Sequence, residues 1–331
     1  MMQSRNIKIT GTGKYMPKRI VTAEEMDELL GVPAGWVEKK SDVKRRHFVE
    51  DETASQMGAF AAQEALKQAG LDFSDIDCLV CTSGTMEQPI PSTAALIQRA
   101  LGQEHSGVPA FDINSTCLSF LTGLDVMSYM VTSGRYRRIL LVSTEIASIG
   151  LNWSHKESAA LFGDGAAAVI IEAAGEREGS RIVCSAMKTY SHGAHLSQIR
   201  GGGTGAHALS VQEDEAFLFE MDGQGIYKMA SRILPGFVAS LLKEAGCSMK
   251  DIQVVVPHQG SAMAMRLISR KLNISKEQLM FITPTHGNTI AASIPMGLHE
   301  AIREGRITRG SRVLLLGTSA GLSVGGMILD Y

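Results

Sequence analysis

Short runs of apolar residues recur along this chain and alternate with segments of helical spacing. The runs 76–81, 139–142 and 313–316 are almost continuously apolar, which is typical of strands buried on both faces. Between such runs, apolar residues return every three or four positions, for example from Leu118 to Val131. This alternation predicts an α/β protein whose helices cover both faces of a sheet.

Two pairs of segments indicate that the chain repeats itself. Residues 66–80 and 242–256 share a pattern of helix end, glycine, turn and buried strand, and the second copy lies 176 positions after the first. Residues 138–144 resemble residues 312–318, which lie 174 positions later. Two matches in the same order, at nearly one offset, predict an internal duplication and therefore two similar α/β halves.

Candidate chemistry is divided between the expected halves. The half at residues 1–174 holds Cys117, which follows a strand-like run and precedes a helix-like segment. The half at residues 175–331 holds His258 and Asn288, each near the end of a strand-like run, and Asn288 also precedes a helix-like segment. The free N–H groups and the dipole at a helix start favour the thiolate, the reactive form of cysteine. Together these residues indicate covalent thioester chemistry at the junction of the halves.

The composition is that of a soluble globular protein and excludes several function classes. The chain has 331 residues, of which 44% are hydrophobic and 20% charged, and its net charge of -2 gives no general basic field for nucleic acid. The longest apolar runs are far too short to span a bilayer, and no apolar stretch of a signal peptide follows the first residues. We therefore expect a cytoplasmic protein without a membrane segment.

Neither disulfides nor a metal site are expected. The five cysteines are scattered and odd in number, which argues against a disulfide framework. Cys78 and Cys81 lie in one apolar run and would point to opposite faces of a strand, so we interpret both as buried structural thiols. His192, His195 and His207 lie near a glycine-rich segment but lack a clear thiol or carboxylate partner for a metal.

Four motifs together resemble one known family. They are the cysteine region 114–120, Phe162-Gly163-Asp164-Gly165-Ala166-Ala167, Pro257-His258-Gln259, and the run from His286 to Pro295. Over nearly its whole length the chain is similar to the β-ketoacyl-acyl-carrier-protein synthases III, which are condensing enzymes of the thiolase superfamily. The resemblance implies a thiolase-like fold with layers in the order αβαβα, and a homodimer.

The resemblance also implies roles for the candidate residues. In that family an acyl-CoA acylates the cysteine, here Cys117. The histidine and asparagine, here His258 and Asn288, then assist the decarboxylation of malonyl-ACP. Backbone N–H groups of Cys117 and of Ala320, within the turn 319–321, would meet the tetrahedral oxyanion. The product starts a fatty-acid chain, and neither a metal nor a redox cofactor is needed.

The substrate entrance matches the family less closely. Trp36 resembles the aromatic residue that stacks on the adenine of coenzyme A. Lys40 and Lys156 stand where better-known members carry arginine, and lysine contacts phosphate as a point charge without the bidentate fork. Ile90 resembles the position that lends a bulky side chain to the acyl pocket of the partner subunit. Its smaller size predicts room for larger or branched acyl groups.

The expected docking site for the acyl carrier protein also departs from the family. Met263 stands where an arginine is expected, on a predicted helix after His258. Arg266, Arg270 and Lys271 follow on the same helix and could substitute for that arginine. Methionine at this position does not alter the expected reaction, but it leaves open which carrier brings the malonyl group.

Three interpretations of the function stay open at this point. The first is a decarboxylating condensation that starts fatty-acid chains. The second keeps the acylated cysteine but changes the donor or acceptor, as in a specialised synthase of secondary metabolism. The third is a non-catalytic module that binds acyl-CoA or a carrier protein. Each residue also has a plainer interpretation: Cys117 as an inert buried thiol, His258 as a core histidine, and Asn288 as a helix cap.

Overall fold

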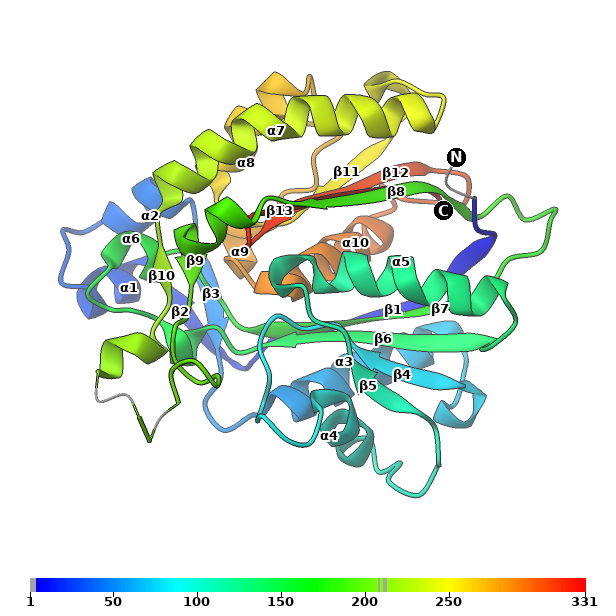
Figure 1. The fold of residues 1–331 in the computed structure, drawn as a ribbon, viewed down its shortest axis with the longest axis horizontal. Helices are drawn as coiled ribbons and strands as arrows, with labels where there is room; N and C mark the ends of the chain where they lie inside the picture. Colours follow the sequence, from blue (N-terminus) through cyan, green and yellow to red (C-terminus); the bar gives the residue numbers. More distant parts are fainter. Residues whose placement is uncertain (1–3, 208, 211–212) are drawn as a thin grey trace.

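The computed structural model describes residues 4–207, 209–210 and 213–331, which form five layers of alternating helices and sheets (Figure 1). Two sheets enclose a central layer of helices, and further helices cover each outer face. This arrangement confirms the predicted α/β fold with layers in the order αβαβα. From bottom to top in Figure 1 the helical layers are α3 (Ala54–Ala69) with α4 (Thr93–Ala100), α5 (Ser119–Thr132) with α10 (Ser293–Arg303), and α7 (Gly223–Glu244) with α8 (Ala262–Lys271).

The two sheets share one plan of strand order and direction. In each, the second strand is antiparallel to both neighbours, and the strands after it run parallel to one another. The first sheet consists, in order, of β1 (Ile7–Tyr15), β7 (Gly165–Ala173), β6 (Arg138–Glu145), β4 (Cys78–Cys81) and β5 (Ala110–Asp112). The second consists of β8 (Arg181–Thr189), β13 (Ser323–Asp330), β12 (Arg312–Ser319) and β11 (Val254–Pro257).

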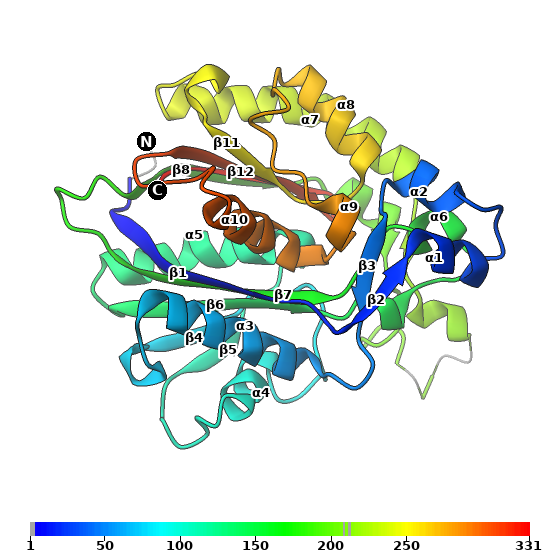
Figure 2. The same cartoon turned by 180° about the vertical axis from the view of Figure 1, so that it is seen from behind.

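A group of short elements packs against one end of the layers, at the right of Figure 2. Its own small core includes Met26, Val37, Phe48, Ala159 and Phe162. This group carries the segments that the sequence assigned to the substrate entrance. Its elements are α1 (Ala23–Leu29), α2 (Trp36–Ser41), α6 (Lys156–Ala159), α9 (Thr283–His286), β2 (Arg19–Thr22), β3 (Arg45–Phe48), β9 (Ser197–Gln198) and β10 (Glu220–Met221).

The cysteines of β4 are structural, as predicted. Cys78 and Cys81 are 0% and 1% exposed. Cys78 belongs to the core between the two sheets, whereas Cys81 belongs to the core that includes the α3 side chains Met57 and Ala61. The two thiols therefore point to opposite faces of the strand, and all five cysteines are free.

The two halves repeat each other in the turns that start the central helices α5 and α10. Asn114 Oδ1 accepts from the N–H of Thr116 at 2.8 Å, and Asn288 Oδ1 accepts from the N–H of Ile290 at 2.9 Å. Thr116 and Ile290 both have positive φ, at 50° and 48°. Each turn is closed by a serine hydroxyl, Ser119 or Ser293, which donates to the carbonyl of Thr116 or Ile290.

This repeat refines the comparison between the halves. All three pairs of equivalent residues are separated by 174 positions. At that offset the counterpart of Asn288 is Asn114, and the counterpart of Cys117 is Ala291. The turns are equivalent, but Cys117 and Asn288 stand at different positions within them.

Close packing of β1 on α3 requires glycine in the strand. A Cβ atom on Gly13 would lie 2.1 Å from Ala61 O and 2.5 Å from Ala65 N. We expect Gly13→Ala to lower the free energy of unfolding by about 1–3 kcal/mol, because the strand must move away from the helix. The change is measured by urea unfolding at equilibrium.

Gly236→Ala in α7 is the matched control for this prediction. A Cβ atom there meets nothing within 4 Å. Alanine also suits a helix interior better than glycine, so a gain of roughly 0.5–1 kcal/mol is expected. Equal unfolding midpoints for the two variants would contradict the packing argument.

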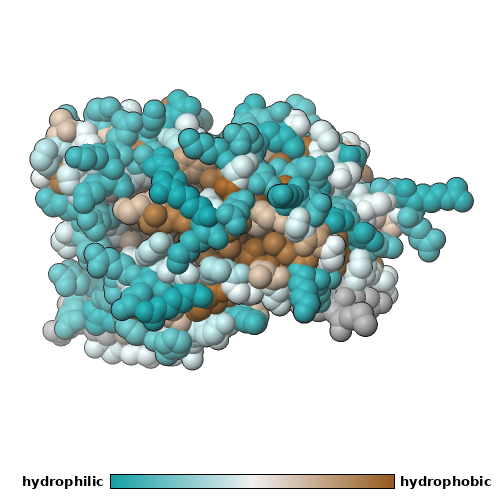
Figure 3. Space-filling model, turned by 90° about the horizontal axis from the view of Figure 1, so that it is seen from above, coloured by the Kyte–Doolittle hydropathy of each residue, from teal (hydrophilic) through white to brown (hydrophobic). Residues whose placement is uncertain are grey.

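The surface is largely hydrophilic when seen from the side of α7 and α8, although apolar residues form a band across the middle of that face (Figure 3). Within the described ranges, no helix combines the length and apolar character needed to cross a membrane. This includes α7, a 22-residue helix.

Candidate active site

Cys117 lies at the start of a central helix, as the sequence predicted. It occupies a single 3-10 turn, Thr116–Leu118, that leads directly into α5. The N–H groups of Cys117 and Ala320 and the hydroxyl of Ser319 lie close enough to its sulfur to lower the pKa of the thiol, and the Ser319 hydroxyl also donates to Ser115 O at 2.8 Å. Two backbone donors thus lie beside the sulfur of Cys117.

The N–H groups at this helix start favour the thiolate, as predicted, but burial acts more strongly on the pKa of Cys117 in the opposite direction. Burial raises the pKa of the Cys117 thiol to about 12, and the nearby Glu145 carboxylate raises it further. The two N–H groups and the Ser319 hydroxyl act in the opposite direction but do not outweigh burial. Cys117 therefore rests as a thiol, and its attack on a substrate requires a proton acceptor.

His258 is held in the tautomer that a proton acceptor needs. It directly follows β11, where its N–H donates to Leu316 O at 2.8 Å, and its Nδ1 lies 2.7 Å from Ser293 Oγ. Ser293 Oγ donates its own hydrogen to Ile290 O at 2.9 Å, so it accepts one from His258 Nδ1. Nε2 is then unprotonated. Burial lowers the pKa of His258 to about 4, which keeps the imidazole neutral near pH 7.

Asn288 is fixed by both its side chain and its backbone. Its Oδ1 accepts from Ile290 N, and its Nδ2 donates to Gly260 O at 3.4 Å. Its backbone N–H donates to Leu161 O at 2.8 Å, and its carbonyl accepts from Gly163 N at 3.1 Å. The carboxamide is thereby oriented, and one of its two N–H groups stays available to a ligand.

A buried arginine supports the segment that holds Asn288. Arg46 is 0% exposed, and its Nη1 donates to Ala160 O at 2.6 Å and to Phe162 O at 3.5 Å. Burial lowers the pKa of Arg46 to about 10. Its remaining donors, Nε and Nη2, have no hydrogen-bond partner among the described residues.

Packing between the halves brings the three predicted residues to one site. The turn of Cys117 packs against β12 and against the turn 290–292 that follows Asn288. A Cβ atom on Gly317 of β12 would lie 2.9 Å from Leu118 Cδ2 and 3.0 Å from His258 Cβ. Glycine at position 317 therefore leaves room for the side chains of Leu118 and His258 to approach each other.

Glu145 is a buried acid at the site that the sequence did not reveal. It ends β6 and is 0% exposed. Its carboxylate accepts from Gly84 N at 2.5 Å, from the N–H and hydroxyl of Thr85, and from the backbone of Ala291. Burial raises the pKa of Glu145 to about 7. The available signal was a polar residue at the end of an apolar strand-like run.

The three residues predicted to bind coenzyme A lie together on α2 and α6. Lys40 Nζ lies 5.8 Å from the ring centroid of Trp36 and 3.4 Å from a carboxylate oxygen of Glu157. Lys156 Nζ donates to Gly31 O at 3.3 Å. Both lysines are exposed, and Trp36 is half-buried against the small end core.

The expected docking helix is α8. Met263 is 60% exposed on it. Arg266 forms an ion pair with Asp42 and lies over the ring of Phe281 at 5.6 Å, and Lys271 donates to Ser231 O at 3.2 Å. Of these three predicted cations, Arg270 alone has a side chain without a hydrogen bond or ion pair to the described part of the chain.

Ile90 lies outside the site of its own chain. It is 84% exposed on the segment between β4 and α4. The structure of one chain therefore agrees with a side chain that is offered to another molecule.

Comparison with known proteins places this site in a family. Residues 111–191 match the model for 3-oxoacyl-[acyl-carrier-protein (ACP)] synthase III, and residues 242–331 match its C-terminal model. A β-ketoacyl-[acyl-carrier-protein] synthase III from Aquifex aeolicus is 32% identical over 98% of this chain and 99% of its own.

Solved structures give the same result. The crystal structure of 3-oxoacyl-[acyl-carrier-protein] synthase III from Aquifex aeolicus VF5 has a TM-score of 0.88 and 30% identity, covering 99% of this chain and 100% of that one. The priming β-ketosynthase of the R1128 polyketide pathway has a TM-score of 0.88 and 26% identity, covering 99% of this chain and 97% of that one.

Fold and site together define a condensing enzyme of the thiolase type. The chain belongs to the β-ketoacyl-acyl-carrier-protein synthase III family, and it is a condensing acyltransferase. The resemblance inferred from the four sequence motifs is thereby confirmed.

Proposed function

We propose that this chain condenses an acyl group from acyl-CoA with malonyl-ACP, with loss of carbon dioxide, in the step that starts fatty-acid chains. The observation that supports this most directly is the environment of Cys117. Its thiol lies against two backbone N–H groups, in a site that also holds a neutral histidine and an oriented carboxamide. Attack, proton transfer and stabilisation of negative charge can each be assigned to a different group.

In the first half-reaction, the Cys117 sulfur attacks the thioester carbonyl of acyl-CoA. The thiol proton passes to His258 Nε2 and from there to the departing coenzyme A sulfur, which leaves as a thiol. The N–H groups of Cys117 and Ala320 stabilise the oxyanion of the tetrahedral intermediate. One carbon–sulfur bond forms as another breaks, and no net proton is taken up.

In the second half-reaction, malonyl-ACP loses carbon dioxide, and the electron pair of the broken bond forms an enolate. Asn288 Nδ2 donates to the enolate oxygen. The negative charge that develops on that oxygen favours protonation of His258, so Nε2 takes a proton from solvent and donates to the same oxygen. The enolate carbon attacks the acyl group, and Cys117 leaves as a thiolate that regains its proton from His258. The one proton consumed balances the loss of the carboxylate charge. No metal or redox cofactor has a step in this proposal.

In this proposal the substrates contact two regions, the short elements at one end of the layers and helix α8. Trp36 meets the adenine of coenzyme A, and Lys40 and Lys156 meet its phosphates. Arg266, Arg270 and Lys271 meet the acidic carrier protein. Because Arg266 already pairs with Asp42, Arg270 is the strongest candidate for a new ion pair.

We extend the proposal to a cytoplasmic homodimer joined at the open edge of β5. That strand ends its sheet, so its outer edge is free to pair with a second copy. Phe111 on β5 and Val126, Tyr129 and Met130 on α5 are exposed apolar side chains near this edge. Ile90 would then reach the acyl pocket of the partner subunit.

A specialised synthase with another donor or acceptor is the second candidate. Two observations favour it. Met263 stands exposed where a docking arginine is expected, and the fold is shared with a priming ketosynthase of a polyketide pathway. The acyl group accepted and the malonyl carrier used distinguish the two candidates.

Intact-mass measurement with a panel of acyl-CoAs tests both candidates. We expect one acyl adduct per chain, formed faster with isobutyryl, hexanoyl or octanoyl-CoA than with acetyl-CoA, because Ile90 leaves space in the pocket. Addition of malonyl-ACP should then give a β-ketoacyl product, whereas turnover with malonyl-CoA alone would favour the specialised synthase.

Ile90→Phe is the control for the acyl preference. The larger ring should slow acylation by the longer and branched acyl-CoAs and leave acetyl-CoA nearly unaffected. Equal or faster acylation of the unmodified protein by acetyl-CoA would contradict the size argument. An adduct that forms without any condensation would contradict the proposed reaction.

A further inference from the structure

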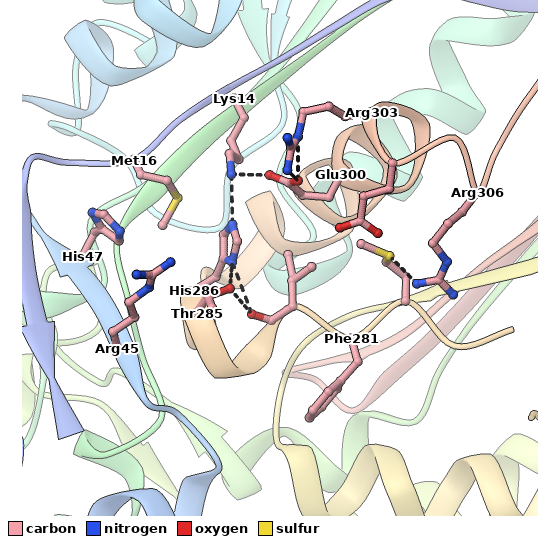
Figure 4. Close-up of a pocket in the computed structure, with 13 residues that line it drawn as sticks. Lys14, Met16, Arg45, His47, Phe281, Thr285, His286, Glu300, Arg303 and Arg306 are labelled. Atoms are coloured by element: carbon pink, nitrogen blue, oxygen red, sulfur yellow. Dashed lines mark hydrogen bonds and ion pairs between the residues drawn. The ribbon is translucent and has the colours of Figure 1, made fainter. Parts of the chain in front are cut away.

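A cavity of about 340 Å³ is lined by residues other than the predicted catalytic ones. Its walls come from β1, β3, the segment leading into α9 and the C-terminal end of α10 (Figure 4). Neither Cys117, His258 or Asn288, nor the three residues predicted to bind coenzyme A, line it. The lining therefore consists of residues other than those assigned to the reaction proposed above.

Cations outnumber carboxylates in the lining of this cavity. Four cationic and two carboxylate side chains give a formal charge of +2. Lys14 and Arg303 both pair with Glu300. Arg306 donates only to backbone carbonyls and a methionine sulfur. The guanidinium group of Arg45 has no hydrogen bond or ion pair to any described residue, although its backbone belongs to β3. Two guanidinium groups thus lack a carboxylate partner.

The two histidines of the cavity respond to this positive field. Burial is the main cause that lowers the pKa of both, to about 4 for His286, and the Lys14 charge lowers both further. Arg45 acts on His47 in the same direction, while Glu300 acts against it on His286. Both imidazoles direct Nδ1 to a backbone carbonyl, so each has an unprotonated Nε2. Burial and the surrounding cations therefore both favour the neutral form of these histidines.

Part of the cavity lining is apolar. Met16, Met280, Ile282 and Phe281 line it. In Figure 4 the Phe281 ring lies on the opposite side of the cavity from Lys14. An inorganic ion would use the cations alone, whereas a molecule with both an anionic group and a small apolar part would use the whole lining.

We propose that this cavity binds a small phosphate monoester, with Arg45 as the main contact to the phosphate and Phe281 against the organic part. A dianion matches the formal charge of the lining, and a guanidinium group without a carboxylate partner matches phosphate geometry with two parallel hydrogen bonds. The volume suits a small ligand and is at the lower end of the range of ligand pockets.

The site lies directly behind the catalytic turn. His286 lines the cavity, and it precedes Asn288 by two residues. Lys14 Nζ donates to His286 Nε2 at 3.2 Å, so a cation of the cavity contacts the segment that carries Asn288. A bound phosphate would meet His286 without entering the space around Cys117.

Nuclear magnetic resonance of the full chain with labelled histidine imidazoles tests the proposal. The probes are phenyl phosphate and inorganic phosphate, and the signals are assigned by single His→Gln substitutions. Phenyl phosphate should shift the signals of His47 and His286, and it should bind several-fold more tightly than inorganic phosphate. Arg45→Gln should weaken both probes about 10-fold, as expected for the loss of a charge-assisted contact.

Two further variants make the result decisive. Phe281→Ala should remove the preference for phenyl phosphate and keep the binding of inorganic phosphate. Arg19→Gln, which changes an exposed arginine paired with Glu25, should alter neither. Equal affinity of the two probes would overturn the assignment to an ester, and unchanged binding in Arg45→Gln would overturn the site. Shifts confined to His155, next to Lys156, would place the probe at the coenzyme A entrance and overturn the proposal as well.

Discussion

Cys117→Ala is expected to abolish the acyl adduct and to lower condensation by about a million-fold, the scale seen when a covalent nucleophile is removed. The reason is that no other thiol has two backbone N–H groups at its sulfur in the part of the chain that the structure describes. Intact mass after incubation with acyl-CoA measures the adduct, and product formation with malonyl-ACP measures condensation.

Decarboxylation separates the role of Cys117 from that of its neighbours. His258 and Asn288 keep their hydrogen bonds when the thiol is removed, so carbon dioxide release from malonyl-ACP should persist in Cys117→Ala. Cys247→Ala is the matched control, because Cys247 is the other cysteine that is not fully buried. An adduct that survives Cys117→Ala would disprove the assignment of the nucleophile.

His258→Ala is expected to slow acylation of Cys117 by roughly 10²–10⁴-fold near pH 7. A thiol with a pKa of about 12 needs a group that accepts its proton. Because the hydrogen of neutral His258 is on Nδ1, its Nε2 can accept that proton. In the unmodified protein the acylation rate should also fall as the pH drops through about 4, where His258 becomes protonated and can no longer accept. Rapid-quench measurement of acyl-enzyme over a pH series checks both effects.

The pH profile decides between proton transfer and a merely structural role for His258. In His258→Ala the acylation rate should be slow and should no longer show the fall near pH 4. His105→Ala, at an exposed histidine between α4 and β5, should retain the rate and the profile of the unmodified protein. A His258→Ala variant that is acylated at the native rate would remove His258 from the first half-reaction.

The fold and the three central residues were predictable because their signals are local. Apolar runs and glycine stops are properties of neighbouring residues, and with the repeat at nearly one offset they predict two similar α/β halves. The order of the five layers came from the family resemblance. Cys117, His258 and Asn288 each stand near the end of a strand-like run, where the chain turns toward one edge of the sheet. Family motifs then connected residues far apart in the chain.

Burial and hydrogen-bond direction were not predictable in the same way. The environment that sets the pKa of Cys117 includes Ser319 and Ala320, which lie more than 200 positions later and act against the effect of burial. A helix start is visible in the sequence, whereas the desolvation that outweighs it depends on packing between the halves. Ser293 was hidden for the same reason, since its hydroxyl fixes the tautomer of a histidine in another element.

The repeated turn has a consequence for how such a site can arise. The chain forms the same turn, with an asparagine before it and a serine closing it, twice. The two helix starts that result approach each other in the middle layer. In one copy the position after the positive-φ residue is Cys117, and in the other it is Ala291. A gene duplication therefore supplies matched backbone geometry at both helix starts. Both copies keep the asparagine, and divergence at the position of Cys117 and Ala291 places the thiol in one copy alone.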